Sequence, residues 1–212
     1  MSKYFLIHGY GQALIVGMPS IPQNGGFYTF DQEIYSGNAY PFVWALTYPR
    51  GQFTALSLIH QWRLYRQEQQ YIQTIELQNR LYNELLEQQP QVIIAHSMGA
   101  QLLCNTLSTY TLPTSVQCII FVQADVHRWD ASQVSIPILN LYCWWDIALW
   151  SSSLLKLKTP YGLIPPQNQQ IQSYFRGLYR GWNKHQDIWR DERYKADILT
   201  RITQVTDLLE DS

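Results

Sequence analysis

The apolar residues of the chain fall into short continuous runs, separated by longer stretches of mixed polarity. A short unbroken apolar run is typical of a strand that is covered on both faces of a parallel sheet. We place strands at 4–7, 42–46, 92–95, 116–122, 136–143 and, with a weaker pattern, 171–175. Since strands that alternate with helices form parallel sheets with right-handed crossovers, we predict an α/β fold. The prediction is a three-layer α/β/α sandwich with a mostly parallel sheet of about six strands.

Helical spacing marks several of the stretches between these runs. From 56 to 86 the chain is rich in Gln, Arg and Glu, and its apolar side chains lie near one helical face until Pro90 ends the segment. Another helix is expected around Leu154 and Leu155. The C-terminal segment predicts a closing helix whose apolar face is formed by Ile198, Ile202, Val205 and Leu209.

The segment 11–40 lacks a clear period, and it contains Pro19, Pro22 and the turn Asn24-Gly25-Gly26. We expect only one short helix within it, near Asp31 to Tyr35. Long loops of a compact domain often serve as lids or binding loops. Whether this loop acts as a lid is left open by the sequence.

One apolar run leads directly into a serine. The run at 92–95 continues through His96 into Ser97, and helical spacing begins at once with Ala100, Leu103, Cys104 and Leu107. The small residues Ala95 and Gly99, two positions before and after Ser97, allow the strand and the helix to pack closely around a strained turn. Such a turn exposes the hydroxyl above the sheet and places the next N–H at a helix N-terminus, which is the geometry of a nucleophile elbow. A serine that only caps the helix is the alternative interpretation.

Composition narrows the class of protein. The 212 residues suffice for one domain, 1–212, with a proper core, and a hydrophobic content of 46% with 15% charged residues is ordinary for a soluble globular protein. A net charge of −1 gives no reason to expect nucleic acid or an anionic membrane as partner. No apolar run approaches the ~20 residues that span a bilayer. Because Met1-Ser2-Lys3 leads straight into a strand, we expect no signal peptide and a cytoplasmic location.

A reactive serine needs a base, and the chain offers five histidines. His8 and His96 are fixed at strand ends, and His60 precedes a helix that nothing places near the sheet. His127 and His185 remain. His185 is favoured, because a Gly and an aromatic residue precede it and a terminal helix anchors its loop.

The base in turn needs an acid that orients it. Asp146 directly follows the predicted strand at 136–143, and it would lie at the edge of the sheet where the elbow opens. Asp125 follows the preceding strand and is the rival. Ser97, Asp146 and His185 occur along the chain in the order Ser, Asp, His that α/β-hydrolases show. The sequence leaves open whether Asp146 or Asp125 is the acid.

These motifs resemble those of the α/β-hydrolase superfamily, and in particular small bacterial lipases and esterases that lack the first two strands of the fold. The resemblance covers most of the chain from Lys3 to Leu155, with a further match around His185. Ala-His-Ser-Met-Gly, with Ala in the first position, is typical of the smallest bacterial lipases. The matching stretches are Leu6-Ile7-His8-Gly9-Tyr10-Gly11, Ile94-Ala95-His96-Ser97-Met98-Gly99 and Trp145-Asp146-Ile147.

The resemblance implies a role for each matched residue. Ser97 is the expected nucleophile, His185 the general base and acid, and Asp146 the residue that orients His185. The backbone N–H groups of Tyr10 and Met98 are expected to form the oxyanion hole. The implied reaction is hydrolysis of a carboxylic ester or thioester through an acyl-enzyme. The spacing of His, Cys and carboxylates indicates no metal site, and no cofactor is expected.

The substrate is expected to be a small apolar ester, because the sequence shows no exposed apolar lid. Six of the eight Trp residues lie from Trp129 onward, and Trp145 and Trp182 are candidates for the wall of a substrate pocket. Trp residues that merely fill the core are an equal alternative. Other functions that the same chain could serve are amide hydrolysis, acyl transfer to an acceptor other than water, and non-catalytic binding on the same fold.

Overall fold

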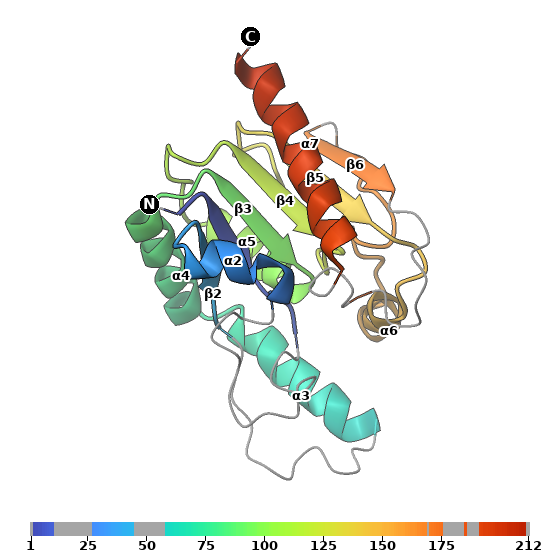
Figure 1. The fold of residues 1–212 in the computed structure, drawn as a ribbon. Helices are drawn as coiled ribbons and strands as arrows, with labels where there is room; N and C mark the ends of the chain where they lie inside the picture. Colours follow the sequence, from blue (N-terminus) through green and yellow to red (C-terminus); the bar gives the residue numbers. More distant parts are fainter. Residues whose placement is uncertain are drawn as a thin grey trace.

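The computed structural model describes residues 2–10, 27–44, 58–168, 170–175, 185 and 191–210. Helical segments separate most of the strands along the chain, and only the fourth and fifth strands follow each other with no helix between them (Figure 1). The strands are β1 (Tyr4–Ile7), β2 (Ala39–Phe42), β3 (Val92–His96), β4 (Cys118–Val122), β5 (Ile138–Tyr142) and β6 (Ile171–Phe175). The helices are the 3₁₀ turn η1 (Tyr28–Phe30), α2 (Asp31–Tyr35), α3 (Leu58–Tyr71), α4 (Ile75–Gln88), α5 (Met98–Leu107), α6 (Ile147–Lys156) and α7 (Glu192–Glu210).

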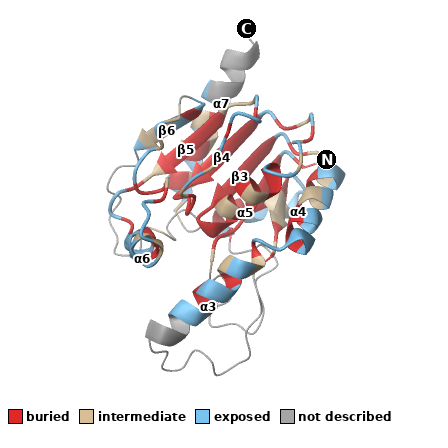
Figure 2. Ribbon diagram, turned by 180° about the vertical axis from the view of Figure 1, so that it is seen from behind, coloured by how far each residue is buried: buried red, intermediate tan, exposed pale blue. Residues whose placement is uncertain are grey.

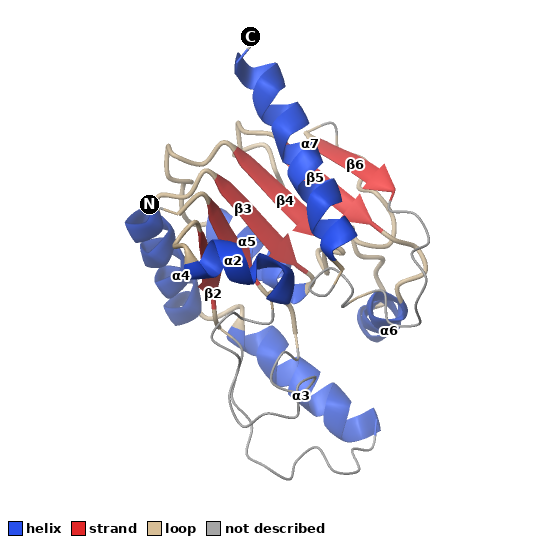
Figure 3. Ribbon diagram, in the orientation of Figure 1, coloured by secondary structure: helices blue, strands red, loops and turns tan. Residues whose placement is uncertain are grey.

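The strands form one six-stranded sheet in the order β2-β1-β3-β4-β5-β6, and every neighbouring pair is parallel. Helices α4 and α5 cover one face, and α2 and α7 cover the other (Figures 1 and 3). The predicted three-layer α/β/α fold is therefore confirmed.

Two apolar cores fill the spaces between these layers. Side chains of a strand alternate between faces, so Phe5 and Ile7 of β1 pack toward α4 and α5, whereas Tyr4 and Leu6 pack toward η1 and α7. The central strands are buried along their whole length, and α4 exposes its outer side whereas α5 has no exposed residue (Figure 2). Burial on both faces is the reason that these strands are continuous apolar runs in the sequence.

The second strand differs from its prediction. We expected it at 42–46, but β2 pairs Ala39–Phe42 with Tyr4–Ile7. β2 lies at the edge of the sheet, where a strand tolerates Pro41. Pairing ends at Phe42 because β1 ends at Ile7, and Trp44 instead donates its backbone N–H to the ring of His8. Residues 45 and 46 lie outside the described residues.

The other helices and strands are of the predicted type, and some of them begin or end at other residues than predicted. The helical segment expected at 56–86 is two helices, because Thr74 adopts an extended conformation and its hydroxyl caps α4 by accepting from the N–H of Leu77. The strands expected at 116–122 and 136–143 are shorter, at Cys118–Val122 and Ile138–Tyr142. Helices α2, α6 and α7 and strand β6 lie where they were expected.

Because all strands are parallel, their carboxyl ends meet at one edge of the sheet, and the residues that follow each strand come together there. His8 follows β1, Ser97 follows β3, Gln123 follows β4, and Cys143 follows β5. Within the described ranges, no helix is long and apolar enough to cross a membrane.

Candidate active site

Ser97 occupies a strained turn between β3 and α5. Its φ of 51° and ψ of −123° lie in a region that non-Gly residues seldom adopt. A Cβ on Gly99 would lie 2.3 Å from the carbonyl oxygen of His8, and a Cβ on Gly9 would lie 2.7 Å from the Cβ of Ser97. Glycine is therefore needed at position 99, within this turn, and at position 9, in the loop that packs against it. The Ser97 side chain makes no capping bond to α5, so the capping alternative is wrong.

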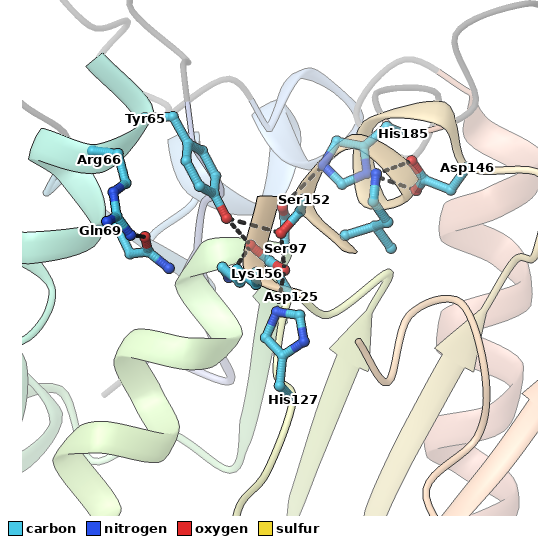
Figure 4. A network of polar contacts seen from close by, with 11 residues as sticks. Tyr65, Arg66, Gln69, Ser97, Asp125, His127, Asp146, Ser152, Lys156 and His185 are labelled. Carbon is cyan, nitrogen blue, oxygen red and sulfur yellow. Dashed lines mark hydrogen bonds and ion pairs between the residues drawn. The ribbon is translucent and has the colours of Figure 1, made fainter. Parts of the chain in front are cut away.

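The hydroxyl of Ser97 begins a chain of hydrogen bonds through His185 to Asp146 (Figure 4). Ser97 Oγ lies 2.9 Å from His185 Nε2, and His185 Nδ1 lies 2.6 Å from Asp146 Oδ2. Since a carboxylate only accepts, His185 Nδ1 carries the proton and Nε2 is left to accept from the hydroxyl. The structure thus brings together Ser97, Asp146 and His185, the three residues selected from the sequence.

Asp146 is fully buried and is held from three sides. It is the N-cap of α6, with Oδ1 accepting from the N–H of Leu149 at 3.0 Å. Its Oδ2 accepts from Gln123 Nε2 at 2.6 Å in addition to His185. Gln123 follows β4 with a φ of 46°, and sequence reasoning missed it because no motif marks that position.

The environment of His185 makes its imidazole more basic than a free one. Burial lowers the pKa of His185, but the charge of Asp146 and the hydrogen bond to it outweigh burial, so the pKa lies above its ordinary value of 6.5. The backbone carbonyl of His185 lies 2.9 Å from His96 Nε2. Because a carbonyl can only accept, His96 donates this bond and ties His185 to the end of β3.

Asp125, the rival acid, belongs to a second polar network. Its Oδ1 accepts from Ser152 Oγ at 2.7 Å and lies 3.1 Å from His127 Nε2. Its Oδ2 accepts from Tyr65 OH and from Lys156 Nζ, both at 2.8 Å. Burial raises the pKa of Asp125, but its hydrogen bonds and the charge of Lys156 prevail and hold the pKa at about 2. The histidine beside Asp125 is thus His127, and the carboxylate bonded to His185 is that of Asp146.

The two expected oxyanion donors follow two different strands, Met98 after β3 and Tyr10 after β1. Met98 is the first residue of α5, so its N–H is one of those that a helix N-terminus leaves without an intrahelical partner. Tyr10 follows Gly9, which is packed against Ser97. The assignment of these two N–H groups to an oxyanion hole stays a prediction.

The structure does not show the two expected pocket residues, Trp145 and Trp182, lining a pocket at this site. Trp145 directly precedes Asp146, but its side chain is 60% exposed and stacks on Trp144 with ring centroids 6.2 Å apart. Trp182 lies outside the described residues, as does 11–26, the first part of the loop considered as a lid. Among the described residues, no group of His, Cys, Asp and Glu could hold a metal ion.

A hollow of about 800 Å³ lies elsewhere on the molecule. It is lined by the loops that precede β4 and β5, between 107 and 116 and between 130 and 136. These loops are at the amino ends of the strands, whereas Ser97 lies at a carboxyl end. The hollow is therefore not part of the candidate active site.

No family model matches this chain, and no curated protein or solved structure is significantly similar to it.

Proposed function

We propose that this protein is a serine hydrolase that cleaves carboxylic esters or thioesters through an acyl-enzyme. The observation that carries the proposal is the unbroken hydrogen-bond chain Ser97–His185–Asp146, with distances of 2.9 and 2.6 Å. A hydroxyl in this setting can lose its proton to the imidazole as it attacks, and the buried carboxylate stabilises the imidazolium that forms. The strained elbow at Ser97 and the order Ser, Asp, His along the chain support the same interpretation.

In the proposed mechanism, Ser97 Oγ attacks the ester carbonyl while His185 Nε2 takes the hydroxyl proton. The N–H groups of Tyr10 and Met98 stabilise the oxyanion, and loss of one such donor typically lowers kcat by about 10²–10³. His185 then gives the proton to the leaving alcohol, which leaves the acyl group on Ser97. Water attacks the acyl-enzyme with His185 as base, and the acid is released.

The proposed reaction does not depend on the length of the acyl chain of the ester. The expectation of a small ester depended on the absence of an exposed apolar lid, and it stays a prediction. The helix that begins at Asp146 has an exposed apolar side, and together with its flanks it exposes Trp144, Trp145, Ile147, Trp150, Leu154, Leu155 and Leu157. A panel of p-nitrophenyl esters of increasing length would give the preference directly.

We also propose that the protein is located in the cytoplasm. The cysteines Cys104, Cys118 and Cys143 are all buried and free. Free thiols are usual in proteins of reducing compartments.

A fluorophosphonate probe tests the proposed function. It forms a covalent adduct only with an activated serine, so mass spectrometry should find one adduct on the wild type and none on Ser97→Ala. Circular dichroism should show that both proteins are folded. A folded wild type that takes up no probe would contradict the hydrolase function and favour a non-catalytic binding protein on this fold.

A further inference from the structure

His8 lies at the end of β1, directly before the turn that packs against Ser97. Its side chain is fully buried, and both ring nitrogens are engaged. Nδ1 lies 2.8 Å from the carbonyl oxygen of Gly9, and Nε2 lies 3.1 Å from the backbone nitrogen of Trp44. Trp44 also donates its indole N–H to the carbonyl of His8 at 2.8 Å, and the two rings stack at 5.1 Å with an angle of 4° between their planes.

These partners permit one protonation state of the imidazole. The carbonyl of Gly9 can only accept, so Nδ1 carries a proton. The backbone N–H of Trp44 can only donate, so Nε2 presents its lone pair. His8 is therefore neutral with the proton on Nδ1. Burial supports this state, because it lowers the pKa of His8 to about 4 despite the opposing bond to Gly9.

The bond from His8 to Gly9 fixes the orientation of one peptide group. The carbonyl of Gly9 and the N–H of Tyr10 belong to the same planar trans peptide, in which C=O and N–H point in opposite directions. Since the carbonyl points to the buried imidazole, the N–H of Tyr10 points away from it. Gly9 itself lies so close to Ser97 that a Cβ would be 2.7 Å from the Cβ of Ser97.

We propose that His8, held in one tautomer by Trp44, is a positioning residue for the oxyanion hole. It fixes the Gly9–Tyr10 peptide so that the Tyr10 N–H is directed at the oxyanion that forms on attack by Ser97. This inference rests on the proposed hydrolase function. It also gives His8 a role other than that of a base, because neither nitrogen of its ring is available to a substrate.

Two substitutions separate this role from a merely structural one. In His8→Asn the side-chain NH₂ lies near the position of Nδ1, so the donor to Gly9 is kept and the acceptor for Trp44 is lost. In His8→Gln the side-chain amide reaches the position of Nε2, so an acceptor for Trp44 is kept and the donor to Gly9 is lost. Each variant loses one buried hydrogen bond, and similar decreases in Tm are expected.

The catalytic effects of these two substitutions should differ. We expect His8→Gln to lower kcat by about 10- to 100-fold, approaching the loss of an oxyanion donor, with KM within about twofold. His8→Asn should keep kcat within about threefold of the wild type, because the peptide remains oriented. Equal kcat values for two folded variants, or an unchanged kcat in His8→Gln, would overturn the inference.

The tautomer can be measured on the wild type, without any variant. The ¹⁵N chemical shifts of labelled histidine, with the His8 signals assigned by their loss in His8→Gln, should show a neutral His8 ring protonated at Nδ1 and unchanged between about pH 5.5 and pH 9. A His8 ring that is protonated at Nε2, or that gains a proton near pH 6.5, would contradict the inference. An inert wild type that takes up no fluorophosphonate would overturn the proposed function and this inference with it. An active wild type with equally active variants would overturn only the inference.

Discussion

His185 is hydrogen-bonded to both Ser97 and Asp146, and in the proposed mechanism its protonation state decides whether Ser97 can react. Nε2 must be unprotonated to accept the hydroxyl proton, yet the interaction with Asp146 raises the pKa of His185 above 6.5. As pH falls through this raised pKa, Nε2 gains a proton and the base is lost. The raised pKa of His185 therefore predicts that activity falls on the acidic side of the pH profile.

We expect kcat/KM for a simple ester to rise with pH and to reach half its maximum above pH 6.5, because this limb reports the base of the free enzyme. Initial rates at subsaturating substrate, from pH 5 to pH 9, would measure it. A midpoint at or below pH 6.5 would contradict the assignment of His185 paired with Asp146.

Substitution of Asp146 also tests the proposed pair of His185 and Asp146. In Asp146→Asn the side chain can still cap α6, because Asn is as good an N-cap as Asp. The amide cannot hold His185 with its proton on Nδ1 or stabilise the imidazolium, so we expect kcat to fall by about 10⁴-fold. Steady-state kinetics and thermal unfolding would measure the two effects separately.

Asp130→Asn is the matched control for this substitution. Asp130 is exposed, and its Oδ1 accepts from the N–H of Ser132 at 3.0 Å, much as Asp146 accepts from Leu149. Its kcat should equal that of the wild type. A comparable loss of activity in both variants would show that Asp146 has no special role.

At the scale of elements, the Asp125 network ties two helices to the strand end beside Ser97. Tyr65 comes from α3, Ser152 and Lys156 come from α6, and all three bind the carboxylate of Asp125. The backbone N–H of Asp125 donates to the carbonyl of Ser97 at 3.0 Å. Helix α6, which Asp146 caps, is thus anchored at its far end next to Ser97, and this anchor favours a fixed position of Asp146.

Replacement of Lys156 should show how far the buried carboxylate of Asp125 destabilises the fold when its cation is absent. We expect Lys156→Met to lower the free energy of unfolding at pH 7 by about 3–5 kcal/mol, because it leaves Asp125 buried with less compensation. Urea denaturation would measure the loss. Arg193→Met is the control, since Arg193 pairs with Asp191 at an exposed site where a change within about 0.5 kcal/mol is expected.

The pH dependence of stability follows from the same group. Asp125 has a pKa of about 2 in the folded protein and an ordinary value of 3.8, so its ionised form stabilises the fold. This contribution is complete above about pH 4 and is lost as pH falls toward 2. In Lys156→Met the pKa of Asp125 rises, so the loss should begin at a higher pH. Identical acid-unfolding curves for the two proteins would contradict this account.

At the scale of the whole molecule, the six-stranded parallel sheet gathers the candidate site from residues that are far apart in the chain. Ser97 follows β3, Asp146 precedes α6, and His185 lies 39 positions beyond Asp146. Because the carboxyl ends of parallel strands share one edge, the position of a residue just after a predicted strand is enough to assign it to that edge.

The sequence by itself determined the features that depend on local pattern. Continuous apolar runs predicted the buried strands, helical spacing predicted α5 and α7, and the small residues around Ser97 predicted the elbow. Each of these follows from the fixed period of a strand or a helix, or from the room that a short side chain leaves.

Only the tertiary structure decided which partners meet. Asp125 and Asp146 have the same context in the sequence, and the difference between them is the direction in which each carboxylate points after its strand. Gln123 bonded to Asp146 and Trp44 bonded to His8 left no mark in the sequence, since their partners lie 23 and 36 positions away. Local period fixes where strands and helices form, whereas hydrogen-bond partners depend on distances that exist only once the sheet is assembled.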